Sequence, residues 1–210
     1  MRHEVDALIT GRLELGAVGR PLPGARESGD DYLVAPSAGG VLLAVADGLG
    51  HGPEAAAVAR AALEQVARHR DASLESLMRL AHGAALRTRG LTMSLARLDP
   101  DARTVAWLGV GNVSGVLVRA SPDSATRRVE ALVVRTGVVG QRLPALRATT
   151  HAWGPADVLA VATDGVERDF VDDVRGPAPV RELAERVMAR RATGRDDALI
   201  VLVRCLAGGS

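Results

Sequence analysis

The most informative stretch of the chain runs from Val41 to Ala62 and reads VLLAVADGLGHGPEAAAVARAA. Its first six residues are apolar, which is too few to cross a membrane and suits a strand buried on both faces. This run ends at a single carboxylate, Asp47, which is followed by three glycines within residues 48–52. Because glycine tolerates backbone angles that other residues resist, the chain can turn sharply here before a helix that begins at Pro53. A buried strand therefore delivers one acid to a glycine-rich turn.

Acids also mark the ends of three other predicted strands. They are Asp164 after the apolar run 158–163, Asp30 and Asp31 before residues 32–35, and Asp196 and Asp197 before residues 198–203. One such acid alone would be read as a helix cap or a turn residue. Its recurrence in four places, with the near-copies VADG and ATDG, indicates that several strands present their carboxylates together.

The composition excludes several classes of function. The chain has 210 residues, of which 47% are hydrophobic and 24% charged, as in an ordinary globular protein, and we expect a single domain spanning residues 1–210. A net charge of +1 provides no basic field for nucleic acid or an anionic membrane, and 2% aromatic residues are too few for base stacking. All 26 basic residues are arginine, so neither a Schiff-base lysine nor a P-loop lysine is available.

Cysteine usage and the N-terminal sequence bear on the cellular compartment. Cys205 is the only cysteine, so no intrachain disulfide and no thiolate zinc cluster can form. The first ten residues, MRHEVDALIT, lack the basic-then-apolar layout of a signal peptide. No apolar run approaches the roughly 20 residues that a membrane-spanning helix needs. We therefore expect a cytoplasmic protein.

The pattern of apolar residues predicts the fold class. Strands are expected over residues 12–19, 31–36, 40–47, 92–98, 104–110, 113–119, 129–135, 146–153, 157–164 and 198–204, and helices over 53–70, 73–89 and 180–191. Consecutive strands with helices grouped between them favour an α+β layered architecture over alternating β/α units. Two antiparallel sheets with helices outside them would bury these runs.

Acids gathered at one rim favour a hard divalent cation as their ligand. Mg²⁺ and Mn²⁺ prefer carboxylate, carbonyl and water oxygens. Apart from His51 in the glycine turn, the histidines of the chain show no ligand spacing; they are His3, His69, His82 and His151. Carboxylates that converge repel one another, and their pKa values rise unless a cation lies among them. Two cations that share one carboxylate can lower the pKa of a bridging water, which is then a nucleophile for a phosphate ester. Gly48 fits this scheme because a residue without Cβ lets its carbonyl approach a metal.

Taken in order, these motifs resemble the metal-dependent protein phosphatase 2C superfamily, and within it the SpoIIE-like branch. The motifs are Gly29-Asp30, VADGLGHGPEAA at 45–56, ATDG at 162–165 and DDALIV at 196–201. The segments GVGNV at 109–113 and GVVGQRLP at 137–144 are similar to those of the small stand-alone RsbX-like members. The resemblance runs from about Gly11 to Arg204. It implies a four-layer αββα sandwich and hydrolysis of phosphoserine or phosphothreonine on a protein.

The same resemblance implies a set of metal ligands. Asp47 would bridge two Mn²⁺ or Mg²⁺ ions, and the carbonyl of Gly48 would bind one of them. Asp164 and Asp196 would bind the other, and Asp30 would bind or orient a metal-bound water.

Several neighbouring residues leave alternatives open. Asp31 and Asp197 are alternative direct ligands. Eukaryotic relatives carry a histidine, assigned as the general acid, where this chain has Leu49. His51 could protonate the leaving serine oxygen or brace the glycine turn, and a metal-bound water is another candidate acid. Arg26 could bind the substrate phosphate as a bidentate fork or lie exposed in a surface loop.

The implied partners come from the RsbX-like members, which act on phosphorylated STAS-domain scaffold proteins of the stressosome. We expect the same class of partner here, a monomer, and no nucleic acid or membrane partner. Two alternatives remain, a non-catalytic phosphatase-fold binding module of a stress-signalling complex and a phosphatase of small phosphoesters. The presence of all four candidate acids favours an enzyme over the binding module.

Overall fold

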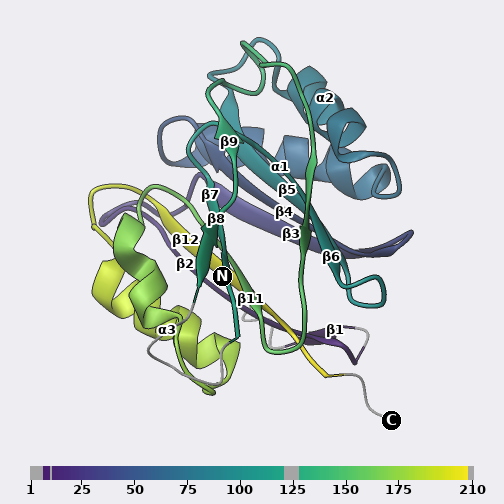
Figure 1. Cartoon of the computed structure of the whole chain (residues 1–210). Coiled ribbons are helices and arrows are strands. Elements are labelled where there is room, and N and C mark those ends of the chain that lie inside the picture. The colour runs from purple at the N-terminus through teal and green to yellow at the C-terminus, as the bar shows by residue number, and fades with distance from the viewer. Residues whose placement is uncertain (1–6, 10, 121–127, 208–210) are drawn as a thin grey trace.

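Two β-sheets pack face to face in the computed structural model, which describes residues 7–9, 11–120 and 128–207. Helices cover the outer face of each sheet, so that four layers follow one another (Figure 1). The strand order is β1-β2-β12-β11-β7-β8 in the first sheet, sheet A, and β10-β6-β5-β4-β3 in the second, sheet B. The predicted αββα sandwich is confirmed.

The elements of each layer come from distant parts of the chain. Sheet A consists of β1 (Ala7–Ile9), β2 (Leu13–Arg20), β12 (Ala198–Cys205), β11 (Val158–Ala162), β7 (Ser114–Val118) and β8 (Val129–Ala131). Sheet B consists of β10 (Thr149–Ala152), β6 (Thr104–Val110), β5 (Leu91–Asp99), β4 (Gly40–Gly48) and β3 (Asp30–Ser37), with β9 (Val134–Arg135) beside β6. The helices are α1 (Pro53–Arg68), α2 (Leu74–Ala85), the 3₁₀ helix η2 (Arg168–Asp173) and α3 (Val180–Arg191).

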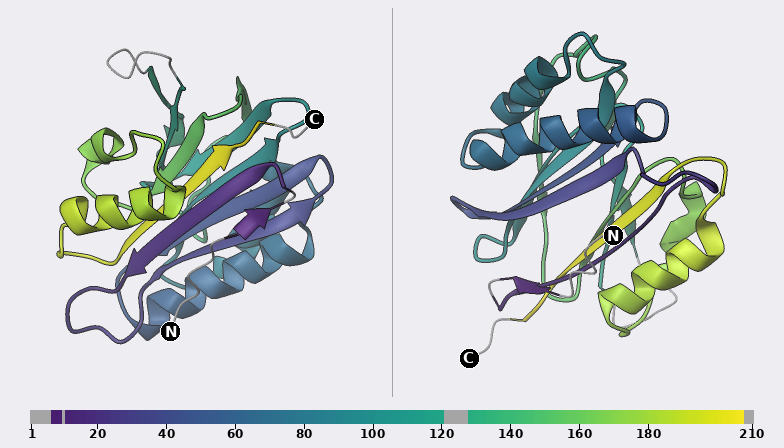
Figure 2. Two further views of the ribbon diagram at one scale, coloured as in Figure 1. Left: turned by 90° about the horizontal axis from the view of Figure 1, so that it is seen from below. Right: turned by 180° about the vertical axis from the view of Figure 1, so that it is seen from behind.

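Three apolar cores hold the four layers together. The core between the sheets contains Trp107 of sheet B and Leu159 of sheet A, both fully buried. Along β4, Val45 faces this core while Ala44 faces α1 and α2, so the strand is buried on both faces as predicted. The third core lies under α3, which Figure 2 shows on the opposite side of the sheets from α1 and α2. Each buried leucine or valine in these cores stabilises the fold by about 1.5–3 kcal/mol.

One predicted strand divides between the two sheets. Residues 129–135 were expected as one strand, but β8 pairs with β7 in sheet A and β9 pairs with β6 in sheet B. The division occurs because Leu132 turns into the core between the sheets, where its N–H donates to Gly115. The β6–β9 pair is parallel, which departs from the expected two purely antiparallel sheets.

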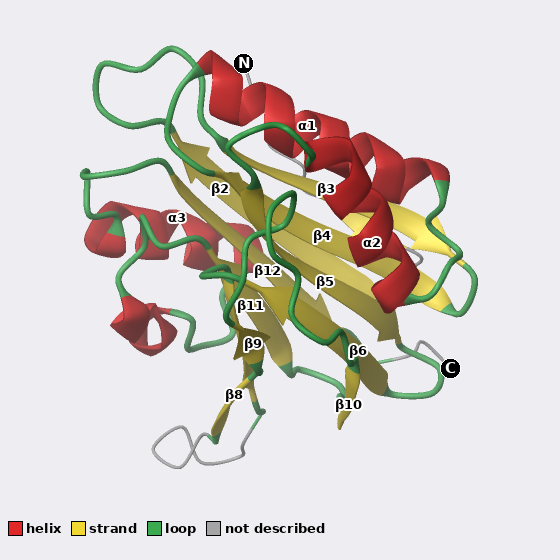
Figure 3. Cartoon of the chain, turned by 90° about the horizontal axis from the view of Figure 1, so that it is seen from above, coloured by secondary structure: helices red, strands yellow, loops and turns green. Residues whose placement is uncertain are grey.

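The second helix ends four residues earlier than predicted. Leu86 leaves the helix in an extended conformation, and Arg87 follows with φ 64°. The Thr88 hydroxyl donates to the carbonyl of Ala85 at 2.6 Å and accepts the N–H of Gly90 at 2.9 Å, which stabilises this exit. Residues 86–90 therefore form a separate connection between α2 and β5, beside α1 (Figure 3). Among the helices that the structure describes, none is long and apolar enough to span a membrane.

Candidate functional site

Four predicted acids meet at one end of the space between the sheets. Asp30 on β3 and Asp47 on β4 are register partners in sheet B. Both face sheet A, since Tyr32 and Val45, two residues away on each strand, lie in the core between the sheets. Asp164 and Asp196 lie beyond the ends of β11 and β12, which pair with each other in sheet A. The negative charges of Asp164 and Asp196 both raise the pKa of Asp47, so the three carboxylates lie near one another.

A buried threonine links the two sheets at this end. The hydroxyl of Thr163, which directly follows β11 of sheet A, donates to Oδ2 of Asp30 in sheet B at 2.7 Å. The same oxygen accepts the N–H of Leu199 at 2.8 Å, which orients the hydroxyl proton towards Asp30. Thr163 therefore holds the Asp30 carboxylate in a fixed position against the opposite sheet.

The pKa values of Asp30, Asp47 and Asp164 are raised above their ordinary value. Burial raises the pKa of Asp30 to about 8, and the charge of Asp47 adds to this effect. The pKa of Asp47 is raised to about 7, first by burial and then by repulsion from Asp164 and Asp196. Hydrogen bonds with Asn112 and Thr92 lower the same pKa and offset part of this rise. The pKa of Asp164 is raised by partial burial and by the charge of Asp196. Near neutral pH the metal-free cluster therefore holds protons that isolated aspartates would release.

The chemistry of this cluster fits a hard divalent cation. Within the described part of the chain, no arginine or histidine forms an ion pair with Asp47, Asp164 or Asp196. The oxygen donors that Mg²⁺ and Mn²⁺ prefer are therefore concentrated at one rim without a compensating protein cation. The described residues nonetheless contain no group of three or more His, Cys, Asp or Glu side chains placed so that they could hold a metal ion as they stand. The acids lie at one rim of the sheets, but their side chains do not form a complete metal coordination site.

Two polar residues that the sequence analysis did not select connect the acids. Thr92 on β5 is the register partner of Asp47, and its hydroxyl lies 3.4 Å from Asp47 Oδ2. The same hydroxyl is hydrogen-bonded to Asn112 Oδ1, and Asn112 Nδ2 donates to Asp164 Oδ2 at 2.6 Å. Asn112 thus connects an acid of sheet A with the strand beside Asp47. Its position in the segment GVGNV was the one available sequence signal.

Gly48 is required for packing. A Cβ on Gly48 would lie 2.3 Å from the carbonyl oxygen of Ala55, in the first turn of α1. Its N–H donates to the carbonyl of Gly29 at 3.1 Å, next to Asp30. The glycine therefore allows β4, α1 and the start of β3 to approach closely beside the acids. Binding of a metal by the Gly48 carbonyl stays a prediction.

The structure favours neither alternative acid as a direct ligand. Asp197 is buried, and its two carboxylate oxygens accept the N–H groups of Leu22 at 2.7 Å and Gly29 at 2.6 Å. It therefore positions the loop that leads into Asp30. Asp31 lies on the opposite face of β3, on the side of Leu33, which packs under the helices.

Comparison with known proteins identifies the family. The sequence model of the family described as Stage II sporulation protein E (SpoIIE) matches residues 37–206. The chain belongs to the SpoIIE family. No curated protein matches the sequence.

Solved structures share the fold of this SpoIIE-family chain. One, described as "The bacterial stressosome: a modular system that has been adapted to control secondary messenger signaling", is 25% identical with a TM-score of 0.83, covering 92% of this chain and all of the other. RsbX in complex with magnesium is 19% identical with a TM-score of 0.82, covering 94% and 97%. The Mycobacterium tuberculosis serine/threonine phosphatase PstP/Ppp is 16% identical with a TM-score of 0.75, covering 93% and 100%. The fold is therefore that of the phosphatase 2C proteins.

Two predicted site residues of this SpoIIE-family chain are not brought into contact with the acids. His51 is exposed in the turn between β4 and α1, and Arg26 is exposed in the loop before β3. In the described ranges, neither side chain forms a hydrogen bond or an ion pair. Their roles as general acid and phosphate ligand stay predictions.

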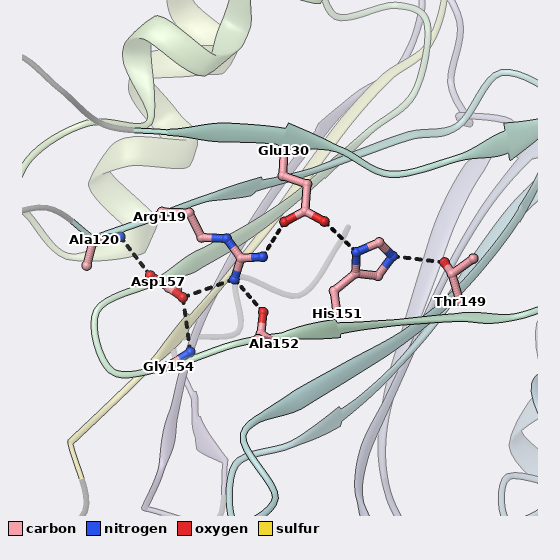
Figure 4. Close-up of polar contacts among 8 residues, drawn as sticks. All are labelled: Arg119, Ala120, Glu130, Thr149, His151, Ala152, Gly154 and Asp157. Carbon is pink, nitrogen blue, oxygen red and sulfur yellow. Dashed lines mark hydrogen bonds and ion pairs between the residues drawn. The ribbon is translucent and has the colours of Figure 1, made fainter.

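Three of the other histidines make their contacts outside the acid cluster. His69 Nδ1 lies 3.0 Å from the carbonyl oxygen of Gln65, His82 Nδ1 accepts the N–H of Gly140 at 2.9 Å, and His3 lies outside the described residues. His151 Nδ1 lies 2.6 Å from Glu130, which also accepts from Arg119 (Figure 4). Arg119 holds the pKa of Glu130 below its usual range and also pairs with Asp157, just before β11. This network is at the opposite end of β11 from Asp164.

Proposed function

We propose that this protein is a metal-dependent protein serine/threonine phosphatase that uses two Mn²⁺ or Mg²⁺ ions. The observation that carries the proposal is the convergence of Asp30, Asp47, Asp164 and Asp196, with the pKa values of Asp30 and Asp47 raised to about 8 and 7. Membership of the SpoIIE family and the shared fold of PstP/Ppp support the same reaction class.

Each acid has a proposed role. Asp47 lies between the two sheets and interacts with both Asp164 and Asp196, so it is the candidate bridging ligand, with the carbonyl of Gly48 beside it. Asp164 and Asp196 are the candidate ligands of the second ion. When bound, two such ions lower the pKa of a shared water so that it can attack phosphorus.

The remaining residues would manage protons and the substrate phosphate. Asp30 is oriented by the Thr163 hydroxyl, which suits a group that orients the attacking water. The leaving serine oxygen needs a proton, for which His51 and a water are the two candidates. Arg26 is the candidate ligand for the phosphate, because a guanidinium matches two phosphate oxygens at once.

The proposed substrates are phosphorylated STAS-domain proteins or related regulatory proteins. The support is the likeness to a stressosome structure and to RsbX, over almost the whole of each chain. We propose that the protein acts on them as a cytoplasmic monomer.

The test is manganese-dependent release of phosphate from p-nitrophenyl phosphate and from a phosphorylated STAS-domain protein. We expect Asp47→Asn to abolish both activities, because a neutral amide cannot bridge two cations. The matched control is Asp172→Asn, which changes an exposed aspartate on η2 and should leave both activities intact. Near-full activity in Asp47→Asn would remove Asp47 from the mechanism.

The same assay separates the two alternative functions. Activity on the small ester with none on any phosphoprotein would indicate a phosphatase of small phosphoesters. Tight binding of the phosphoprotein without hydrolysis of either substrate would indicate a non-catalytic binding module.

A further inference from the structure

A pocket of about 510 Å³ lies between the start of α1 and the connection from α2 to β5. Its apolar lining includes Leu49, Ala55 and Val58, and its charged lining consists of Arg87, Arg89 and Glu54. The pocket therefore combines an aliphatic wall with two guanidinium groups.

The backbone pairing places this pocket close to the candidate catalytic site. Asp47 pairs with Thr92 on β5, and Gly48 pairs with Leu91. One residue beyond this pair, the N–H of Leu49 donates to the carbonyl of Gly90 at 3.0 Å, so the contact between the two segments continues as far as the pocket. Since a strand rises about 3.3 Å per residue, Leu49 of the pocket lining lies roughly 7 Å along the backbone from Asp47. An extended peptide with its phosphoserine at the acids would therefore reach the pocket with residues two to four positions away.

The two arginines are available to bind a ligand. Over the ranges that the structure describes, neither guanidinium forms a hydrogen bond or an ion pair. A Cβ on Gly50 would lie 2.6 Å from Arg89 Nη1, so this guanidinium lies against the turn that follows Asp47. Gln141 Nε2 donates to the carbonyl of Arg89 at 2.5 Å, and the Thr88 hydrogen bonds hold the same connection. The arginines thus project from a fixed backbone.

We propose that this pocket docks the segment of the protein substrate next to its phosphoserine. An aliphatic side chain of that segment packs against Leu49 and Val58, and one or two Asp or Glu side chains pair with Arg87 and Arg89. Planar guanidinium groups match carboxylates, whereas a lone phosphate monoester has no group that reaches this pocket. Glu54 on the facing wall disfavours a longer acidic run. This inference rests on the proposed phosphatase function and adds to it the sequence class of the substrate.

The test compares three serine peptides of equal length, each with a leucine three residues from the serine. Their flanking residues beside this leucine are two glutamates, two glutamines or two lysines. Binding of the unphosphorylated, fluorescently labelled peptides is measured by anisotropy in EDTA, so that the reading does not depend on catalysis. The phosphorylated peptides are then compared by kcat/KM with Mn²⁺.

The variants reverse charge at the pocket or elsewhere. Arg87→Glu with Arg89→Glu should weaken binding of the glutamate peptide about 10-fold or more and reverse the preference towards the lysine peptide. The matched control, Arg70→Glu with Arg147→Glu, makes the same change in net charge at two exposed arginines outside the pocket and should keep the native preference. Equal binding of the three peptides by the native protein, or an unchanged preference in the pocket variant, would overturn the inference.

Failure of the docking inference can be told apart from failure of the proposed function. Hydrolysis of p-nitrophenyl phosphate without any peptide preference would leave the phosphatase proposal standing and remove the docking pocket. A charge-dependent peptide preference in EDTA, without hydrolysis of any ester, would support docking and remove the phosphatase.

Discussion

Replacing Asp30 by Asn should stabilise the metal-free protein, and more so as the pH rises. Asp30 is 2% exposed, and its pKa in the folded chain is about 8 against an ordinary value of 3.8. The folded state therefore binds this proton more tightly than the unfolded chain does. The associated stability is fully present below about pH 4 and is lost as the pH rises through about 8.

The magnitude follows from the distance between the two pKa values. The ordinary pKa of 3.8 lies about three units below pH 7, and each unit equals about 1.4 kcal/mol. At pH 7 Asp30 therefore lowers the free energy of unfolding by on the order of 4 kcal/mol. At pH 5 the same reasoning gives about 2 kcal/mol. Asn removes the titrating group but keeps an oxygen that accepts the Thr163 hydroxyl at the position of Oδ2. This loss is large for a domain whose total stability is typically about 5–15 kcal/mol.

The assay is urea unfolding in EDTA at pH 5 and pH 7, followed by fluorescence of the buried Trp107 and Trp153. We expect Asp30→Asn to exceed the native protein in free energy of unfolding at both pH values, with roughly two to three times the margin at pH 7. The exposed Asp172→Asn variant is the control and should match the native protein. An Asp30→Asn variant that is less stable than the native protein, or a margin independent of pH, would refute the electrostatic reasoning. Excess Mn²⁺ should narrow the margin at pH 7 by stabilising the native cluster, by about 2.7 kcal/mol at 100 times its Kd.

Three further substitutions test individual contacts. Gly48→Ala should lower the melting temperature and the free energy of unfolding, the latter by about 3 kcal/mol or more, because its Cβ would lie 2.3 Å from a backbone oxygen. The control Gly83→Ala, in open space on α2, should be neutral or stabilising, and equal melting of the two variants would contradict this packing. Asn112→Ala should lower kcat/KM with Mn²⁺ about 10-fold while leaving thermal stability nearly unchanged, since it removes the bond that positions Asp164; native kinetics would show that the bond is dispensable. Asp197→Ala should cost about 2–4 kcal/mol in urea unfolding, because the buried N–H of Gly29 and the partly buried N–H of Leu22 lose their acceptor. A loss below about 0.5 kcal/mol would contradict the role of Asp197 as the anchor of the loop before β3.

The sequence alone determined the elements whose cause is local. The apolar run 41–46 indicated a buried strand, and the glycines after Asp47 allowed a sharp turn before the helix at Pro53. Acids at the ends of several strands predicted a shared site for a hard cation, and the order of strands and helices predicted the layers. These features depend on neighbours along the chain, so they can be read without coordinates.

The tertiary structure decided which of two adjacent acids faces the site. The faces of β3 are distinguished only by what packs on them, so Asp30 and Asp31 cannot be separated by local pattern. Asp197 became a loop anchor because Leu22 and Gly29, more than 160 residues earlier, place their N–H groups against it. The roles of Thr92, Asn112 and Thr163, the division of residues 129–135 and the pocket beside α1 have the same origin. Each depends on contacts between segments distant in the chain, whose register is set only when the sheets pack.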